Sequence, residues 1–214
     1  REENVPLETE VDKLSQQYQK LQGAMAVTFQ GQERTMQQMG AFLEENERPL
    51  RQEAWRLSTE RRLRDAEALD DIFDQMLNLR HQMAKNAGFE DFRAFQFRRF
   101  ERFDYTPDDC LHFHRAVEQL VVPVLRQTTQ ERQAALGLAS VRPWDMACDR
   151  YGRPPLKPFQ TTAQFAEGCK TVFNRVDSEL GREFQEMMDL GLLDLDSRKG
   201  KAPGGYQTDL AEVR

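Results

Sequence analysis

The 214-residue chain carries a net charge of −6, with 39% hydrophobic and 31% charged residues whose signs are mixed along its length. That hydrophobic content supports one core or two small domains. Because no strong field of one sign develops, neither nucleic acid nor an anionic membrane is favoured as a partner of the whole chain. No apolar run approaches the ~20 residues of a membrane-spanning helix, and no signal peptide is evident.

Cys110, Cys148 and Cys169 are an odd number of cysteines without a close pair or a C-x-x-C motif. They are interpreted as reduced thiols of a cytoplasmic protein. Because no histidine and asparagine arrangement lies near them in the sequence, nucleophilic catalysis has little support. The chain begins at Arg1 rather than at methionine, which favours a mature product or an excised piece.

The N-terminal region is predicted to form a helix, a short strand and a second, shorter helix. Apolar residues recur at intervals of four and three over residues 7–21, which is the stripe of an amphipathic helix, and Gly23 ends it. Residues 26–29 have the composition of a strand that turns at Gly31. Thr35 is placed to cap the N-terminus of the short helix.

One long helix is predicted next. Residues 49–87 contain no glycine, and Pro49 is their only proline. Apolar residues keep a helical spacing from Leu69 to Met83, while charge is dense elsewhere on the same stretch. Gly88 then supplies a left-handed C-cap.

The following segment, residues 89–105, contains six phenylalanines interleaved with arginines. Such a run is compatible with a stacking platform for single-stranded nucleic acid. Acidic residues inside the run, among them Glu90 and Glu101, oppose a track for phosphates. A packed turn between two helices is therefore favoured, with the arginines extended over apolar surface or paired with those carboxylates.

A further helix is predicted to begin at Thr106, a hydroxyl N-cap that is followed by Pro107 and by two carboxylates in the first turn. We expect Pro123 to kink this helix near its end. The apolar face that we expect to be buried consists of Leu111, Phe113, Val117, Leu120, Val121 and Val124.

Residues 137–159 are the least regular part of the chain and contain four prolines. They are predicted to form a connecting loop that crosses the structure. Trp144 and Tyr151 are expected to pin this loop.

A last long helix is predicted beyond the loop. Thr161 or Thr162 caps its start, its core stripe runs over residues 165–187, and Gly191 ends it. The chain then breaks into a glycine-rich segment, residues 194–206, which the helical frame is expected to hold in place. This segment is not a P-loop, because no Gly-Lys-Ser/Thr follows a strand and opens a helix.

No metal site is predicted within this chain. The histidines are His81, His112 and His114. His112 and His114 point about 200° apart on a helix, so they cannot share one face. His114 and Glu118 are four residues apart, but no third ligand is apparent, and neither surrounding sequence is a His-Glu-x-x-His motif. Core or surface histidines are the favoured interpretation.

Four strings occur in one order with plausible spacing: AKNAGFEDF at 84–92, DYTPD at 104–108, VRPWD at 141–145 and DLDSRKGKAPGGY at 194–206. Together they resemble the oligoendopeptidase F branch of the thimet-oligopeptidase-like zinc metallopeptidases. The resemblance runs through roughly residues 5–208. Each string alone is modest, and their order makes the resemblance specific.

The resemblance implies a largely helical fold around a deep channel, with zinc held by a His-Glu-x-x-His helix and a downstream glutamate. In such enzymes zinc polarises the peptide carbonyl and activates water, and the glutamate of the motif acts as general base. The motif follows the segment that matches Gly204, Gly205 and Tyr206, whereas this chain stops at Arg214. No catalytic or metal-binding residue is therefore carried over: zinc belongs to the parent enzyme, and this chain is predicted to be inactive alone.

The expected fold is mainly α, a multi-helix array with a short β-hairpin near the C-terminus, forming part of a larger channel-enclosing metallopeptidase. Residues 1–45 are expected to form N-terminal helices and a short strand or hairpin. Residues 46–190 form the long-helix scaffold of the peptidase domain. Residues 191–214 form a β-hairpin that leads towards the absent zinc helix.

That hairpin is expected to border the peptide channel, with Gly204, Gly205 and Tyr206 as substrate-binding residues. The two glycines let another backbone approach closely, as strand-addition binding of an extended peptide requires. A tight turn with only structural duties is the alternative. The implied partners are short peptides, cleaved by the parent at internal bonds, and the remaining C-terminal catalytic part of the same protein.

A second class of function stays open, namely a self-standing helical binding or scaffold module descended from such peptidases. A reading frame that ends at Arg214 favours the module, and one that continues into His-Glu-x-x-His favours the enzyme. Nucleic-acid binding through residues 89–105 is a third, weaker option. Neither nucleic acid nor a membrane is predicted as a partner.

Overall fold

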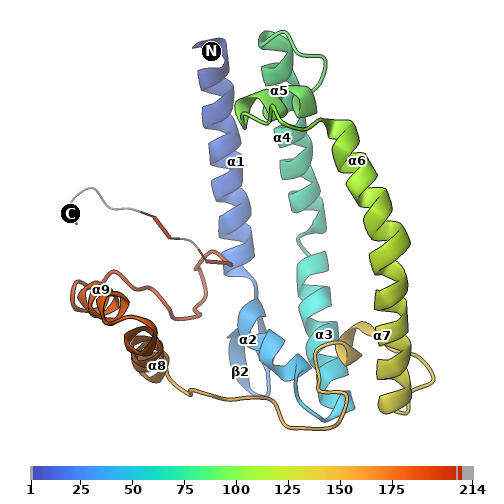
Figure 1. Ribbon diagram of the computed structural model, residues 1–214, viewed down its shortest axis with the longest axis vertical. Helices are drawn as coiled ribbons and strands as arrows, with labels where there is room; N and C mark the ends of the chain where they lie inside the picture. The colour runs from blue at the N-terminus through green and yellow to red at the C-terminus, as the bar shows by residue number, and fades with distance from the viewer. Residues whose placement is uncertain (1, 206, 209–214) are drawn as a thin grey trace.

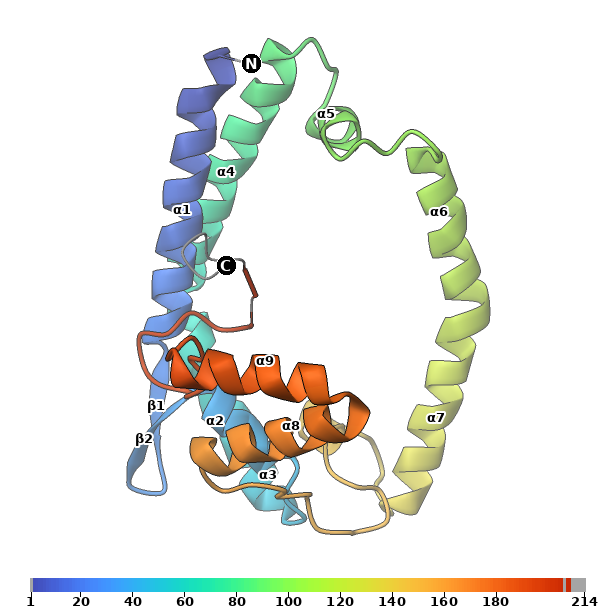
Figure 2. The ribbon, with the colours of Figure 1, turned by 60° about the vertical axis from the view of Figure 1, so that its left-hand side comes forward.

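The computed structural model describes residues 2–205 and 207–208 and is mainly α-helical (Figure 1). Figure 2 shows an arch in which α1 and α4 lie on one side, α6 and α7 lie on the other, and α5 bridges them at one end. The α-helices and strands are α1 (Val5–Ala24), β1 (Ala26–Phe29), β2 (Gln32–Thr35), α2 (Met36–Gly40), α3 (Arg48–Leu63), α4 (Ala66–Asn86), α5 (Phe92–Arg99), α6 (Pro107–Ala116), α7 (Val122–Ala135), α8 (Thr162–Val176) and α9 (Ser178–Asp189). The shorter helical segments are η1 (Glu2–Asn4), η2 (Ala41–Leu43), the π-helical η3 (Val117–Val121) and η4 (Pro143–Asp145).

Helices α1 and α4 pack side by side along much of their length, as Figures 1 and 2 show. Leu14 of α1 and Ile72 and Met83 of α4 are buried, as the predicted stripes require, whereas Tyr18 and Phe73 of the same stripes are exposed. The N-terminus is fixed to the far end of α4, because Asn4 Nδ2 donates to the carbonyl oxygen of Met83 at 3.0 Å. Gly88 adopts the left-handed conformation predicted for it, with φ of +77°.

The strand predicted at residues 26–29 is confirmed, and it pairs with β2 as an antiparallel hairpin. Gln30 and Gly31 both have positive φ, which is the geometry of the tight turns that join two twisted strands. Thr35 then caps α2, as predicted, with its hydroxyl accepting from the N–H of Gln38 at 3.2 Å. Phe29 lies in a buried cluster with residues from α2 and α3.

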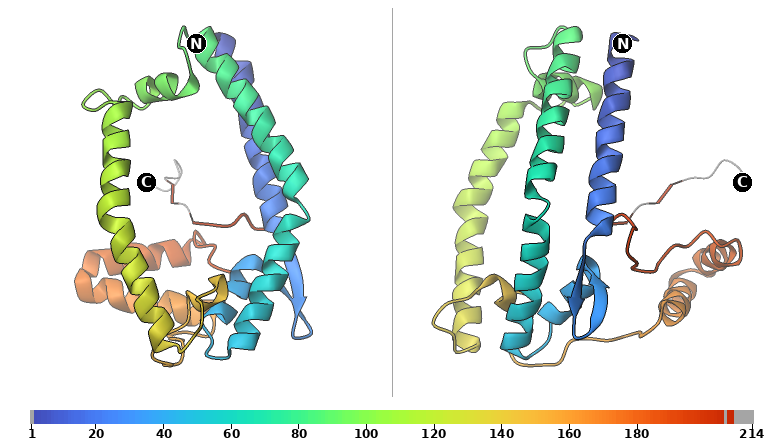
Figure 3. Two further views of the ribbon diagram at one scale, coloured as in Figure 1. Left: turned by 90° about the vertical axis from the view of Figure 1, so that its right-hand side faces the viewer. Right: turned by 180° about the vertical axis from the view of Figure 1, so that it is seen from behind.

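The single long helix predicted over residues 49–87 is instead two helices, α3 and α4, which break at Arg64 and Asp65 (Figure 3). Asp65 leaves the helical region, with φ of −103° and ψ of 9°, and its side chain accepts from Arg61 at 2.6 Å across the break. The break separates two packing tasks, because α3 contacts β1, η2 and η4 whereas α4 contacts α1. Neither glycine nor proline marks the change, so the sequence pattern gave no signal.

The helix that begins at Thr106 is confirmed, but the expected burial of its apolar face is wrong. Phe113 is 67% exposed and Leu120 is 71% exposed, and Leu111, Val121 and Val124 are exposed as well. Within the described part of the chain, α6, η3 and α7 contact mainly one another. The stripe is therefore amphipathic without a partner to cover it.

The kink expected at Pro123 takes the form of the π-helical turn η3, which lies just ahead of it. Proline lacks an N–H and crowds the preceding turn. A wider i→i+5 turn accommodates that crowding, so the helix continues to Ala135 rather than ending.

The last predicted helix also divides, into a helical hairpin of α8 and α9 that stands away from α1 and α3 (Figure 3). Thr161, one of the two residues predicted as candidates for this position, is the N-cap of α8. Asp177 is extended and caps α9 by accepting from the N–H of Glu179 at 2.8 Å. The two helices approach closely at Gly181, where a Cβ would collide with the side chain of Asn174.

The expectations for the connecting loop are met only in part. Trp144 packs on Trp55 with ring centroids 5.2 Å apart, which pins η4 to α3. Tyr151 is 66% exposed, and its ring lies beside Arg150 and Arg153 of the same loop, so it does not pin the loop.

The β-hairpin predicted near the C-terminus is wrong for the described residues. Residues 190–205 and 207–208 contain no strand, and the two-stranded sheet lies at β1 and β2 instead. Tyr206 and residues 209–214, which the prediction also covered, lie outside the described residues. No described helix combines the length and apolar character that crossing a membrane demands.

Candidate functional site

The segment that precedes Gly204 forms a compact loop, residues 194–201, at the C-terminal end of α1 and beside the β1–β2 hairpin (Figures 1 and 2). We call it the 194–201 loop. It follows the α8–α9 hairpin and lies between it and α1. The chain then continues through Gly204 and Gly205, which are exposed.

Three charged side chains hold the 194–201 loop in shape. Arg198 pairs with both carboxylate oxygens of Asp194, with Nη2 2.7 Å from Oδ2. Lys201 Nζ donates to the carbonyl oxygens of Asp194 and Asp196 at 2.6 and 3.0 Å, and to Asp194 Oδ1 at 3.2 Å. Hydrogen bonds from Arg198, and then from Lys201, hold the pKa of Asp194 well below its usual range. The loop is therefore closed by a carboxylate that stays ionised.

The loop docks on α1 at a position that only glycine fits. The N–H of Gly200 donates to the carbonyl oxygen of Gly23 at 2.7 Å. A Cβ at Gly23 would lie 2.8 Å from the carbonyl oxygen of Lys201, which is closer than real Cβ contacts come. Gly23 was predicted as a helix end, but α1 continues to Ala24, so its main role is to admit the loop backbone.

A second set of contacts fixes the loop to the β1–β2 hairpin and α2. Ser197 Oγ lies 2.9 Å from Thr35 Oγ1, and the carbonyl oxygen of Ser197 accepts from Gln38 at 3.1 Å. Lys199 Nζ pairs with Glu33 at 2.6 Å. The capping residue of α2 thus also anchors a segment more than 150 residues away along the chain.

Of the predicted substrate-binding residues, the structure describes Gly204 and Gly205, and Tyr206 lies outside the described residues. Gly204 has φ of +97°, and a Cβ at either glycine would meet no atom within 4 Å. The backbone is therefore bare and accessible just after the anchored loop. This geometry permits the close approach of another backbone.

A buried ion cluster, which sequence reasoning missed, holds the VRPWD string in place. Asp145 is fully buried and accepts from Arg48 at 2.9 and 3.0 Å and from Arg51 at 3.0 Å. Burial raises the pKa of Asp145, but hydrogen bonds from Arg48, from the N–H of Arg142 and from Arg51 outweigh burial and leave it below its ordinary value. The cluster attaches the loop that precedes α8 to the N-terminal end of α3.

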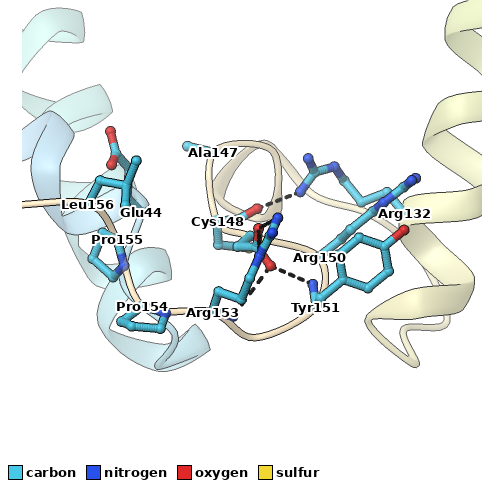
Figure 4. Close-up of a pocket in the computed structure, with 11 residues that line it drawn as sticks. Glu44, Arg132, Ala147, Cys148, Arg150, Tyr151, Arg153, Pro154, Pro155 and Leu156 are labelled. Atoms are coloured by element: carbon cyan, nitrogen blue, oxygen red, sulfur yellow. Dashed lines mark hydrogen bonds and ion pairs between the residues drawn. The ribbon is translucent and has the colours of Figure 1, made fainter.

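A cavity of about 490 Å³ lies beside this cluster and is lined by Glu44, Arg132 and residues 147–151 and 153–156. Figure 4 shows the side chains that line it. Arg132 donates to the carbonyl oxygen of Cys148 at 2.7 Å. Arg153 grips Asp149 with contacts of 2.9 and 2.6 Å and lowers the pKa of that carboxyl to about 2. The donor groups of these two arginines are therefore already engaged by atoms of the chain itself.

The residues present do not fit a zinc centre. His81, His112 and His114 are exposed, and no group of three or more metal-ligating side chains is found among the described residues. The site that the described chain builds is therefore one of backbone and anchoring contacts.

The chain belongs to peptidase family M3, whose sequence profile matches residues 41–214. Its fold is similar to that of a protein assigned as oligoendopeptidase F from Bacillus anthracis strain Ames, with a TM-score of 0.89 and 29% identity. It is also similar to PZ peptidase A solved with an inhibitor, with a TM-score of 0.87 and 28% identity. Within family M3, these likenesses place the chain in the oligoendopeptidase F branch.

The alignments cover almost all of this chain but little more than a third of those structures. They span 97% of this chain and 38% of the first relative, and 96% of this chain and 36% of the second. A search of curated proteins finds no match. The chain thus corresponds to one part of a larger peptidase fold.

Proposed function

We propose that the chain is the helical part of a zinc-dependent oligoendopeptidase that hydrolyses internal bonds of short peptides. Membership of peptidase family M3 and the likeness to oligoendopeptidase F support this proposal. The chain supplies a wall of the peptide channel, and zinc would be held by residues other than those described. Alone, the chain is inactive.

The exposed apolar face of α6, η3 and α7 is the observation that carries the proposal. An uncovered stripe that includes Phe113 and Leu120 is unusual for a stable monomer, because large exposed apolar patches mark interfaces. The relatives are more than twice as long as this chain. We propose that the catalytic part of the same protein covers this face.

The substrate-binding role falls to Gly204, Gly205 and Tyr206. The anchored loop before them fixes where their backbone starts, and the bare glycines admit an extended peptide. In the complete enzyme, Gly205→Val is expected to raise KM or abolish cleavage. Ala202→Val adds similar bulk at a nearby exposed position and serves as the control; unaltered kinetics for Gly205→Val would favour a structural turn.

The experiment that tests the proposal compares this chain with the protein obtained by extending it along its reading frame. The extended protein should cleave an internally quenched peptide, lose activity with a chelator and regain it with zinc. The 214-residue chain should show no cleavage under the same conditions. Zinc-dependent cleavage by the short chain contradicts its inactivity, whereas a frame that ends at Arg214 favours the self-standing helical module.

A further inference from the structure

The turn after α5 leaves two arginines, Arg98 and Arg102, exposed and stacked on aromatic rings. The N–H of Arg102 donates to the carbonyl oxygen of Phe97 at 3.0 Å, and that of Glu101 donates to Arg98 at 3.1 Å. This pair of bonds is the Schellman motif, which needs a left-handed residue after the C-cap. Here that residue is Glu101, with φ of +54°, whereas Gly88 fills the same position after α4.

The left-handed conformation of a non-glycine residue costs roughly 1–2 kcal/mol, so something must hold it. Arg102 is carried back over α5, where its guanidinium carbon lies 5.3, 5.0 and 5.9 Å from the ring centroids of Phe97, Phe100 and Tyr105. Strain of this kind is found at ligand-binding positions more often than elsewhere. The turn thus places one cation over three aromatic rings.

A second guanidinium extends the same surface, because that of Arg98 lies 5.0 Å from the ring centroid of Phe103. Phe100 and Phe103 are exposed, as are Arg98 and Arg102. Stacking uses the faces of a guanidinium and leaves its N–H edges available. Among the described residues, neither Arg98 nor Arg102 has a side-chain hydrogen bond or an ion pair.

The other two arginines of α5 differ in this respect. Arg99 pairs with Glu8 of α1 at 3.0 Å, and Arg93 lies 3.9 Å from Asp91. Their charges are directed to carboxylates of the chain itself. Arg93 therefore offers a matched control on the same helix.

We propose that Arg98, Arg102 and the rings of Phe100 and Phe103 bind a carboxylate that lies next to an apolar or aromatic side chain of a peptide. Guanidinium edges match a carboxylate in a bidentate manner, and the exposed rings take the neighbouring side chain. Glu101 beside Arg102 disfavours a polyanion such as nucleic acid. That the ligand is a peptide rests on the proposed function, in which this surface would anchor one end of a substrate.

The test measures binding by the 214-residue chain, without cleavage, using an acetylated tetrapeptide that ends in leucine and phenylalanine. The free acid is expected to bind about tenfold more tightly than the amidated peptide, because only the carboxylate offers the guanidinium edges two charged acceptor oxygens. Arg102→Gln should abolish this preference, and Arg93→Gln should retain it. Arg102→Lys keeps the positive charge but loses the planar guanidinium that binds a carboxylate through two N–H groups. It should therefore retain only part of the preference for the free acid.

A third peptide, amidated but with glutamate before phenylalanine, separates a chain terminus from an acidic side chain as the source of the carboxylate. Binding of either carboxylate above the fully amidated peptide supports the site. Equal binding of charged and amidated peptides, no binding of any, or stronger binding of single-stranded oligonucleotides overturns it. Because the test measures binding and not cleavage, its result can be interpreted even if the peptidase proposal fails.

Discussion

The two sides of the arch share the same amphipathic helical pattern but differ in what covers it. On the side of α1 to α4, apolar residues such as Phe29, Met39 and Ala54 are buried against one another. On the side of α6 and α7, residues of the same kind, including Phe113 and Leu120, are exposed. Periodicity therefore predicts which face of a helix needs a partner, and the described residues cover much of that face on the first side but leave it exposed on the second.

The sharpest way to break this comparison is to truncate the same residue type on each side. Phe29→Ala should lower the free energy of unfolding by about 3–5 kcal/mol, because it leaves a cavity in a packed cluster. Phe113→Ala should change it by less than about 0.5 kcal/mol, because the ring is exposed. Urea denaturation of both variants measures the difference, and equal losses would contradict the assignment of a covered and an uncovered side.

A substitution in the buried ion cluster is expected to cost nearly as much stability as Phe29→Ala. Asp145→Ala leaves the guanidinium of Arg51, which is only 4% exposed, without its charge partner, so a loss of about 3–5 kcal/mol is expected. The pKa of Asp145 is lowered from its ordinary value, so its contribution to stability is complete above the pKa of an unfolded aspartate and is lost as the pH falls through the lowered pKa.

The control for this prediction is a more exposed pair of the same chemistry, Asp149 and Arg153, whose side chains are 24% and 73% exposed. Asp149→Ala removes a surface partner of Arg153 and should cost no more than about 1 kcal/mol. Thermal unfolding at neutral and acidic pH compares the two variants. If the Asp145→Ala protein were as stable as the Asp149→Ala protein, the buried ion cluster would not be needed to hold the loop that precedes α8.

A smaller effect is expected at the contact between α1 and the 194–201 loop. Gly23→Ala places a methyl group 2.8 Å from the carbonyl oxygen of Lys201, so the loop must shift, at a cost of about 1–3 kcal/mol. Gly168→Ala, inside α8 with open space around it, should instead stabilise by ~0.5–1 kcal/mol. Hydrogen exchange should rise in the 194–201 loop for Gly23→Ala alone, and unchanged protection there would refute the docking role.

The smallest effect is expected at the strained turn after α5. Glu101→Gly relieves the left-handed conformation and should raise stability by up to about 1 kcal/mol. The melting temperature checks this, with Asp104→Gly as a control that should not gain. Destabilisation by Glu101→Gly would mean that the side chain of Glu101 itself supports the turn.

Local signals in the sequence predicted much of this fold, because they act over a few residues. Capping residues such as Thr35 and Thr106, and the left-handed Gly88, lie where their chemistry places them. The break at Asp65 was missed because it arises from packing partners distant in the sequence. The break at Asp177 was missed although Asp177 itself caps the next helix. The β-hairpin predicted near the C-terminus was also wrong for the described residues.

In that segment the charges of Asp194, Arg198 and Lys201 close a loop in place of the predicted two-stranded turn. The candidate residues Gly204 and Gly205 are accessible, as the prediction requires, and their role stays a prediction. Asp145 was missed as an anchor because its partners Arg48 and Arg51 are more than 90 residues away. No local pattern reports such a pairing.

The most direct measurement of the central claim is the effect of Phe113→Ala in two settings, this chain and the protein extended along its reading frame. If the catalytic part covers α6 and α7, the substitution should cost little in the short chain and about 3–5 kcal/mol in the extended protein. The extended protein should also gain zinc-dependent peptide cleavage. A negligible cost in both settings would contradict the claim that this face is an internal interface of a larger peptidase.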